Sequence, residues 1–179
     1  MIELPNSALC AQLAYKGRYR VEQVRNGLII AVREGFNAVV TEGKNKNLNV
    51  FFRGTTSFTT WYLGLLNTAP SLDVGDTYAV HAGWTEFTDY TFGGNAYRAV
   101  WAPAAASGGA VSNAAPIVFD ITASVSTPVA GVCCVGNIAA STAPGNTAGG
   151  GTLWGTMEFA SDIPVITGDQ LKITYGVSA

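Results

Sequence analysis

The pattern of apolar and polar positions predicts a chain made mostly of β-strands. Residues 18–25 (RYRVEQVR) largely alternate between apolar and polar side chains, and Asn26-Gly27 separates them from a second apolar run, LIIAVREGF. Asn-Gly tolerates the positive φ angles that both central positions of a type I′ turn require. These residues therefore predict a β-hairpin near the N-terminus.

From residue 55 onward, short apolar runs are separated by Gly, Pro, Asn and Asp, a pattern typical of all-β domains. The predicted strand regions are 61–66, 77–87, 96–101, 116–124, 128–137, 152–160 and 169–178. Their spacing and the lack of a long helical pattern favour a β-sandwich or jelly-roll-like body. Segments 102–115 and 138–151 are rich in small residues and are predicted to be loops, the second of them exposed.

One or two short helices are expected beside the strands. Residues 4–14 allow one, with Asn6 or Ser7 as its N-cap. Residues 37–54 predict a strand followed by a helix that ends near Gly54. In that helix the spacing of Leu48, Phe51 and Phe52 would place one apolar stripe against the body.

The charges divide the chain into two regions. Residues 1–54 carry eight basic and four acidic side chains, whereas residues 55–179 carry two basic and eight acidic ones. Charged residues make up only 12% of the chain, about half the usual share. We therefore predict a basic N-terminal arm (1–54) joined to a β-sandwich body (55–179). The low charge fits either a neutral β domain or a subunit whose surface is largely interface.

The basic residues of the arm are the candidate partner-binding residues, and an acidic surface is their expected partner. The alternative is that the hairpin arginines are solubility charges on an exposed ribbon. The net charge of −2 points to no nucleic-acid or membrane partner. The six candidates are Arg18, Arg20, Arg25, Arg33, Lys44 and Lys46.

Three cysteines are present, at positions 10, 133 and 134. Adjacent residues of a strand point to opposite faces, so Cys133 and Cys134 are poor disulfide partners. Free, buried thiols in a protein made in a reducing cytoplasm are expected. The first ten residues lack the regions of a signal peptide, and no run of 18 apolar residues predicts a membrane span.

No pattern of residues predicts catalysis, a metal site or a cofactor. The single histidine, His81, is expected to be structural, and no Cys-x-x-Cys spacing predicts zinc. A carboxylate pair for glycoside hydrolysis is a remote alternative. The aromatic residues of 61–101 are expected to be mostly core, with a sugar-stacking surface as the alternative.

Seven short segments stand in a distinctive order along the chain. They are 43–52 (Gly-Lys-Asn and an apolar helix ending in Phe), 60–65 (TWYLGL), 80–86 (VHAGWTE), 98–101 (RAVW), 113–119 (NAAPIVF), 151–154 (GTLW) and 168–175 (GDQLKITY). In this order they resemble segments of small virion structural proteins of tailed bacteriophages. The resemblance covers about residues 40–179, while the first 40 residues match only loosely and the Cys133-Cys134 pair departs from the usual pattern.

The resemblance implies a structural protein of the virion rather than an enzyme. The favoured expectation is a capsid decoration, or cement, protein on the capsid exterior, with the major capsid protein and further copies of itself, as a dimer or trimer, as partners. The alternative is a tail-fibre or receptor-binding component that recognises a host surface glycan, with loops such as 138–151 holding the sugar.

Overall fold

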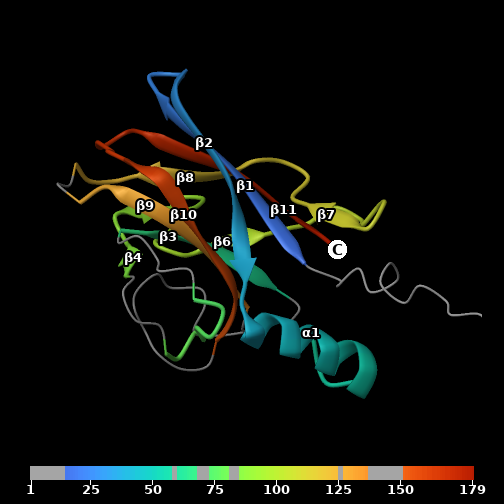
Figure 1. Ribbon diagram of the computed structural model, residues 1–179. Helices are drawn as coiled ribbons and strands as arrows, with labels where there is room; N and C mark the ends of the chain where they lie inside the picture. The colour runs from blue at the N-terminus through green and yellow to red at the C-terminus, as the bar shows by residue number, and fades with distance from the viewer. Residues whose placement is uncertain (1–14, 58–59, 68–72, 81–84, 125–126, 137–150) are drawn as a thin grey trace, which may run out of the picture.

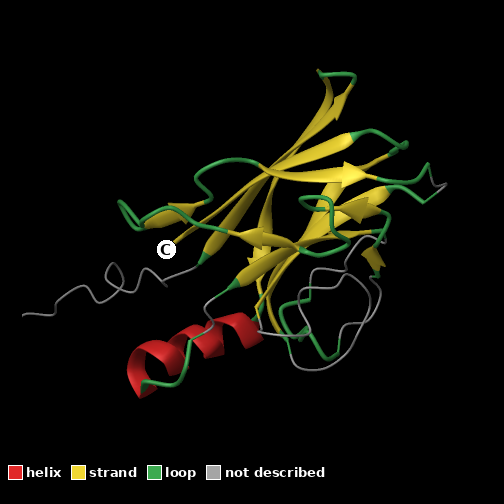
Figure 2. Ribbon diagram, turned by 180° about the vertical axis from the view of Figure 1, so that it is seen from behind, coloured by secondary structure: helices red, strands yellow, loops and turns green. Residues whose placement is uncertain are grey.

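The computed structural model describes residues 15–57, 60–67, 73–80, 85–124, 127–136 and 151–179. Two antiparallel sheets pack against each other, and one helix extends from one end of the molecule (Figures 1 and 2). The strands are β1 (Lys16–Arg25), β2 (Leu28–Val39), β3 (Trp61–Leu66), β4 (Glu86–Phe87), β5 (Tyr90–Thr91), β6 (Ala99–Trp101), β7 (Ala110–Ser112), β8 (Ile117–Ile121), β9 (Val129–Gly136), β10 (Thr152–Ile163) and β11 (Gln170–Ser178). The predicted mainly-β sandwich is confirmed.

The first sheet has the order β2-β1-β11-β8-β5, with β7 also paired to β11. The second sheet has the order β10-β9-β3-β4, with β6 also paired to β3. Strand β2 connects the two sheets, because its last residues, Ala38 and Val39, pair with Thr156 and Gly155 of β10. The sheets are therefore continuous at one corner of the sandwich.

The predicted hairpin is confirmed. β1 and β2 are antiparallel neighbours, and the turn residues Asn26 and Gly27 have φ angles of 52° and 79°. Both angles lie in the left-handed region that Asn and Gly tolerate best. The Asn-Gly pair in the sequence was therefore enough to predict the hairpin.

The hairpin is built into the first sheet. On the side away from β2, β1 pairs with β11 in an unbroken register from Lys16 opposite Ser178 to Val24 opposite Gln170. The ladder joins residues near the two ends of the described chain, and Figure 1 shows β1 between β2 and β11. The division into arm and body at residue 54 stays a prediction, but the hairpin strands share a sheet with the body.

The core lies between the sheets and alternates along each strand. Tyr19 and Val21 of β1 and Ile173 and Tyr175 of β11 are fully buried, and the rings of Tyr19 and Tyr175 stack with centroids 4.1 Å apart. The residues between them in sequence face outward, as the period of two requires. The inward face of the hairpin is therefore part of the hydrophobic core.

Strand β9 is buried along its whole length. It lies between β3 and β10, and the two faces of the sheet are covered by two different clusters of apolar residues. Cys134 belongs to the cluster between the sheets, whereas Cys133 belongs to a second cluster with Tyr62 and Tyr78. The prediction that the two thiols lie on opposite faces and are free is confirmed, and burial raises the pKa of both.

Helix α1 (Thr41–Arg53) ends where the sequence predicted, with Gly54 at a φ of 63°. The predicted packing of its apolar stripe is wrong, because Leu48, Phe51 and Phe52 are 49%, 79% and 75% exposed. The helix contacts β10 through its first turn instead. A Cβ atom on Gly43 would lie 2.9 Å from the Trp154 ring, so the helix backbone packs directly on that side chain.

Glu42 completes the attachment of α1, because its carboxylate accepts hydrogen bonds from the backbone N–H groups of Leu153 and Tyr78 (2.6 and 2.9 Å). The first turn is therefore fixed by one glycine and one carboxylate. The apolar side chains lie in the second half of the helix, which extends away from the sheets (Figure 2).

Two other predicted regions differ from the structure. Only Glu86–Phe87 of the region 77–87 is a strand among its described residues, and Thr77 to Val80 form a turn closed by a backbone hydrogen bond. The predicted loop 102–115 contains the short strand β7. The predicted helix 4–14, His81 and most of the loop 138–151 lie outside the described residues.

A buried ion pair joins the segment before β6 to β4. The guanidinium of Arg98 donates to Oε1 of Glu86 from Nε (3.0 Å) and Nη2 (2.7 Å), and also to the Tyr78 hydroxyl (2.8 Å). Both charged side chains are inaccessible to solvent. Burial disfavours the charged form, but the neighbouring Glu86 carboxylate raises the pKa of Arg98 overall.

Replacing Arg98 by Met is expected to lower the free energy of unfolding by about 3–5 kcal/mol, because the buried Glu86 carboxylate loses its counterion. Urea unfolding measures this. The exposed Arg53→Met is the control and should change little. A Glu86→Met/Arg98→Met protein should recover much of the loss; a double variant as unstable as Arg98→Met would show that the lost charge is not the cause.

Asp169, at the end of the turn that leads into β11, is the second buried carboxylate that holds elements together. It accepts two hydrogen bonds from Arg25 (2.7 and 2.8 Å), one from Gln23 (2.8 Å) and one from the Ile166 N–H (3.1 Å). The hydrogen bonds from Arg25 are the main cause of its lowered pKa, against the opposing effect of burial. The Arg25 charge is thus used within the fold.

Because the folded pKa of Asp169 lies below its unfolded value of about 3.9, its contribution to stability is complete above that value and is lost as the pH falls through the folded pKa. Asp169→Asn is expected to cost about 2 kcal/mol near neutral pH, the scale of lost hydrogen bonds to a charged group. The difference from wild type should shrink at pH 2–3. Urea titrations at both pH values test this, and an equal deficit at both would contradict it; Asp162→Asn is the exposed control.

Candidate functional site

Arg18 and Arg20 lie on the outward face of β1, where they form an exposed network with two glutamates. Glu34 of β2 lies directly opposite Arg20. One Glu34 carboxylate oxygen accepts from Arg18 (3.0 Å) and the other accepts from Arg20 (2.6 Å), which also pairs with Glu22. The hydrogen bonds from Arg20 and then Arg18 lower the pKa of Glu34, so the carboxylate is ionised at neutral pH.

The other four predicted partner-binding residues lie elsewhere. Arg25 is held by Asp169, and Arg33 donates to the backbone carbonyl and the hydroxyl of Ser161 (2.9 and 3.0 Å). Lys44 and Lys46 are on α1, where the Lys46 ammonium donates to the Thr56 carbonyl (2.7 Å). The structure therefore brings two of the six together and gives Arg25 and Arg33 roles within the fold.

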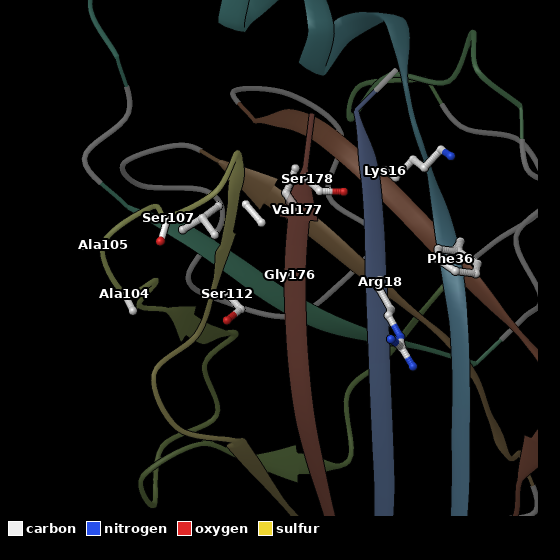
Figure 3. Close-up of a pocket in the computed structure, with 12 residues that line it drawn as sticks. Lys16, Arg18, Phe36, Ala104, Ala105, Ser107, Ser112, Gly176, Val177 and Ser178 are labelled. Atoms are coloured by element: carbon white, nitrogen blue, oxygen red, sulfur yellow. The ribbon is translucent and has the colours of Figure 1, made fainter. Parts of the chain in front are cut away.

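A groove crosses the outward face of β2, β1, β11 and β7 beside Arg18. It has a volume of about 440 Å³, and Figure 3 shows Lys16, Arg18 and Phe36 on one side and Ser112 with the segment before β7 on the other. We call it the outer groove. Its lining residues are Lys16, Arg18, Phe36, Ala104, Ala105, Ser107, Ala110, Val111, Ser112, Gly176, Val177 and Ser178.

The outer groove exists because Gly176 has no side chain. Gly176 of β11 pairs with Arg18 on one side and with Ser112 on the other, so it occupies the floor between them. A Cβ atom there would lie 3.1 Å from the Val111 carbonyl oxygen and 3.2 Å from the Ser112 Cβ. Small side chains on β7 and on the segment before it keep the opposite wall low.

A second hollow of about 330 Å³ extends the groove along the strands. It shares Arg18, Ser112 and Gly176 with the first, and adds Arg20, Glu34 and Thr174. The two hollows together make up the outer groove, which carries cationic, hydroxyl and aromatic groups and, in the second hollow, the carboxylate of Glu34. Such groups suit a polar ligand with some apolar faces, because charged groups fix its orientation and the aromatic ring adds contact area.

Sequence reasoning missed Lys16, Phe36, Gly176 and the β7 residues. Phe36 is 68% exposed on the strand face that also carries Glu34, but the sequence of β2 shows an apolar run rather than a regular alternation. The pairing of Gly176 with Arg18 and Ser112 was not visible in the sequence either, because it depends on two long-range ladders. A glycine inside a predicted strand was the available signal for a close approach or a depression.

Most of the aromatic residues considered for sugar stacking are core. Tyr62, Tyr90 and Trp101 are buried, and Tyr97 is 53% exposed. Trp61 and Trp101 instead line a hollow of about 240 Å³ together with Trp154 and Tyr15. Phe36 has an exposed ring and lines the outer groove, whereas Trp84 lies outside the described residues.

Within the part of the chain that the structure describes, no three His, Cys, Asp or Glu side chains are grouped so that they could hold a metal ion. No helix there is long and apolar enough to cross a membrane.

Comparison with known protein families shows to which family the chain belongs. Residues 38–178 match the family described as Podophage GP4 fiber I protein gp80. The chain belongs to this family. The match includes α1 and the body, but it begins after most of the hairpin.

Membership of the gp80 family makes the chain a structural protein of a tailed-phage virion, as the resemblance of its segments implied. The family name describes a fibre, so it supports the tail-fibre alternative more than the capsid decoration protein. No curated protein and no solved structure matches the chain.

The exposed Glu34 network is expected to contribute little to stability, since solvent screens such pairs. Glu34→Gln should therefore leave the urea midpoint of the gp80-family protein unchanged within error, in contrast to Asp169→Asn. A large loss of stability would instead mean that the fold depends on the Glu34 carboxylate that pairs with Arg18 and Arg20.

Proposed function

We propose that this protein is a component of the phage tail fibre that binds a glycan of the host surface through the outer groove. The family description supports the fibre, and the outer groove supports the binding. The single observation that carries the proposal is an open groove in which Lys16, Arg18, serine hydroxyls and the exposed Phe36 ring converge.

These groups match the chemistry of a sugar chain. A pyranose ring has an apolar C–H face, which packs on an aromatic ring, and hydroxyl groups, which exchange hydrogen bonds with serine hydroxyls and with backbone groups. A groove accepts an extended chain more readily than a flat face does. Repetition of the subunit in the virion would multiply a weak single contact, because linked sites bind with high effective concentration.

The capsid decoration function, with the major capsid protein as partner, stays a prediction that the family description supports less. Counting copies in purified virions separates the two. A few to a few dozen copies per particle fit a tail fibre, and hundreds fit a shell protein on the capsid exterior. Self-association as a dimer or trimer fits both functions.

The chain offers a matched pair of variants for the glycan proposal. Phe36 and Phe52 are similarly exposed, 68% and 75%, but Phe36 lines the outer groove and Phe52 lies on α1. Phe36→Ala should weaken binding to surface polysaccharide purified from the host about tenfold, the equivalent of 1.4 kcal/mol, because burying a phenylalanine ring is worth about 1.5–3 kcal/mol. Phe52→Ala should bind like wild type.

Biolayer interferometry with the immobilised polysaccharide measures both variants, and urea unfolding confirms that they are folded. Equal affinities of Phe36→Ala and wild type would show that the ligand is not held in the outer groove. Wild-type protein that binds no host polysaccharide would contradict glycan binding itself.

A further inference from the structure

We propose that the glycan held in the outer groove is acidic, with a carboxylate on its sugar, and that the carboxylate of Glu34 competes with it for Arg18. This inference rests on the proposed glycan-binding function and adds the class of ligand. Three observations carry it: the charge of the groove, the partners of Glu34, and the groups that surround Arg18.

The larger hollow of the outer groove is lined by two cationic side chains and by no acidic one. Lys16 and Arg18 follow each other on the outward face of β1, and every other lining residue is uncharged. In a chain with a net charge of −2, a groove lined by charges of one sign favours an anionic ligand. Glu34 lines only the smaller hollow, at the other side of Arg18.

Glu34 shows how this surface holds a carboxylate. Its two oxygens accept from two different arginines, at 3.0 Å from Arg18 and 2.6 Å from Arg20. Both arginines keep the carboxylate ionised, as they would a uronic acid group. Because the side chains of Arg18 and Glu34 are 65% and 40% exposed, exchanging Glu34 for another carboxylate requires no burial of charge.

The guanidinium of Arg18 is the link between the two hollows. It donates to Glu34 from a single nitrogen, Nη2, and a guanidinium has five N–H donors. An anionic group in the larger hollow therefore competes with Glu34 for this one guanidinium. Glu34 lowers the affinity, because it repels the bound anion or has to be displaced from Arg18.

The neighbours of Arg18 favour a sugar over an acidic polypeptide. Phe36 lies directly opposite Arg18 on β2, and Gly176 lies opposite it on β11, with Ser112 beyond. One carboxylate on Arg18 thus places the rest of its molecule between an exposed aromatic ring and a hydroxyl group. A carboxylated pyranose uses all three contacts, whereas a glutamate side chain uses only the charge.

The test uses the full chain and surface polysaccharide from the host in two forms, native and carboxyl-reduced, in which uronic acids are converted to neutral sugars. The native form should bind about tenfold more tightly at low salt, since a charge-assisted hydrogen bond is worth about 1.5–3 kcal/mol. Added salt should reduce this difference, because the groove is open to solvent.

Three variants show which residues cause the tighter binding of the native polysaccharide. Arg18→Gln should bind the native form about tenfold more weakly and the reduced form like wild type. Glu34→Gln should bind the native form several-fold more tightly. Lys172→Gln is the matched control, because Lys172 is on β11 opposite Glu22 and lines neither hollow. It should bind like wild type.

The outcomes separate this inference from the proposed function. If wild type binds both forms equally, or if Glu34→Gln binds the native form more weakly, the ligand is not acidic although glycan binding stands. If neither form binds, the proposed function fails and the inference fails with it. If polyglutamate competes as well as the native polysaccharide, the partner is an acidic protein surface and the sugar class is wrong.

Discussion

The ladder between β1 and β11 is the constraint on which the rest of the structure depends. It pairs the first described strand with the last, over the whole length from Lys16 to Val24. Because successive side chains of a strand alternate, this one register determines both faces at once. Inward, it stacks Tyr19 on Tyr175 in the core; outward, it places Arg18 beside Gly176 and so creates the floor of the outer groove.

The same ladder changes the meaning of the basic hairpin. Charge counting along the sequence separates a basic arm from an acidic body, but three of the hairpin arginines have carboxylate partners in the fold. Arg25 binds Asp169 from the far end of the chain, and Arg18 and Arg20 bind Glu34 from the neighbouring strand. A surface made this way is less basic than the sequence count suggests, because Glu34 and Asp169 balance part of its charge.

Local features of the sequence predicted the elements that local chemistry controls. Asn26-Gly27 fixed the hairpin, Gly54 ended the helix, and apolar runs marked β3, β8, β9, β10 and β11. Long-range contacts controlled the rest. Nothing near Gly43 in the sequence indicates that it packs on Trp154. The apolar side chains of α1 were therefore predicted to face the body, whereas they are exposed. The groove needs two ladders at Gly176, which the strand pattern alone does not reveal.

Native-state hydrogen exchange of the full chain tests the central claim, that β1 is a core strand and the outer groove is built on it. Backbone amides of β1 that bond to β11 should exchange as slowly as those of β9, because they open only with global unfolding. Amides of β1 that exchange as fast as those of an exposed loop, while β9 stays protected, would mean that the hairpin is a separate arm and that no fixed groove lies between Arg18 and Ser112.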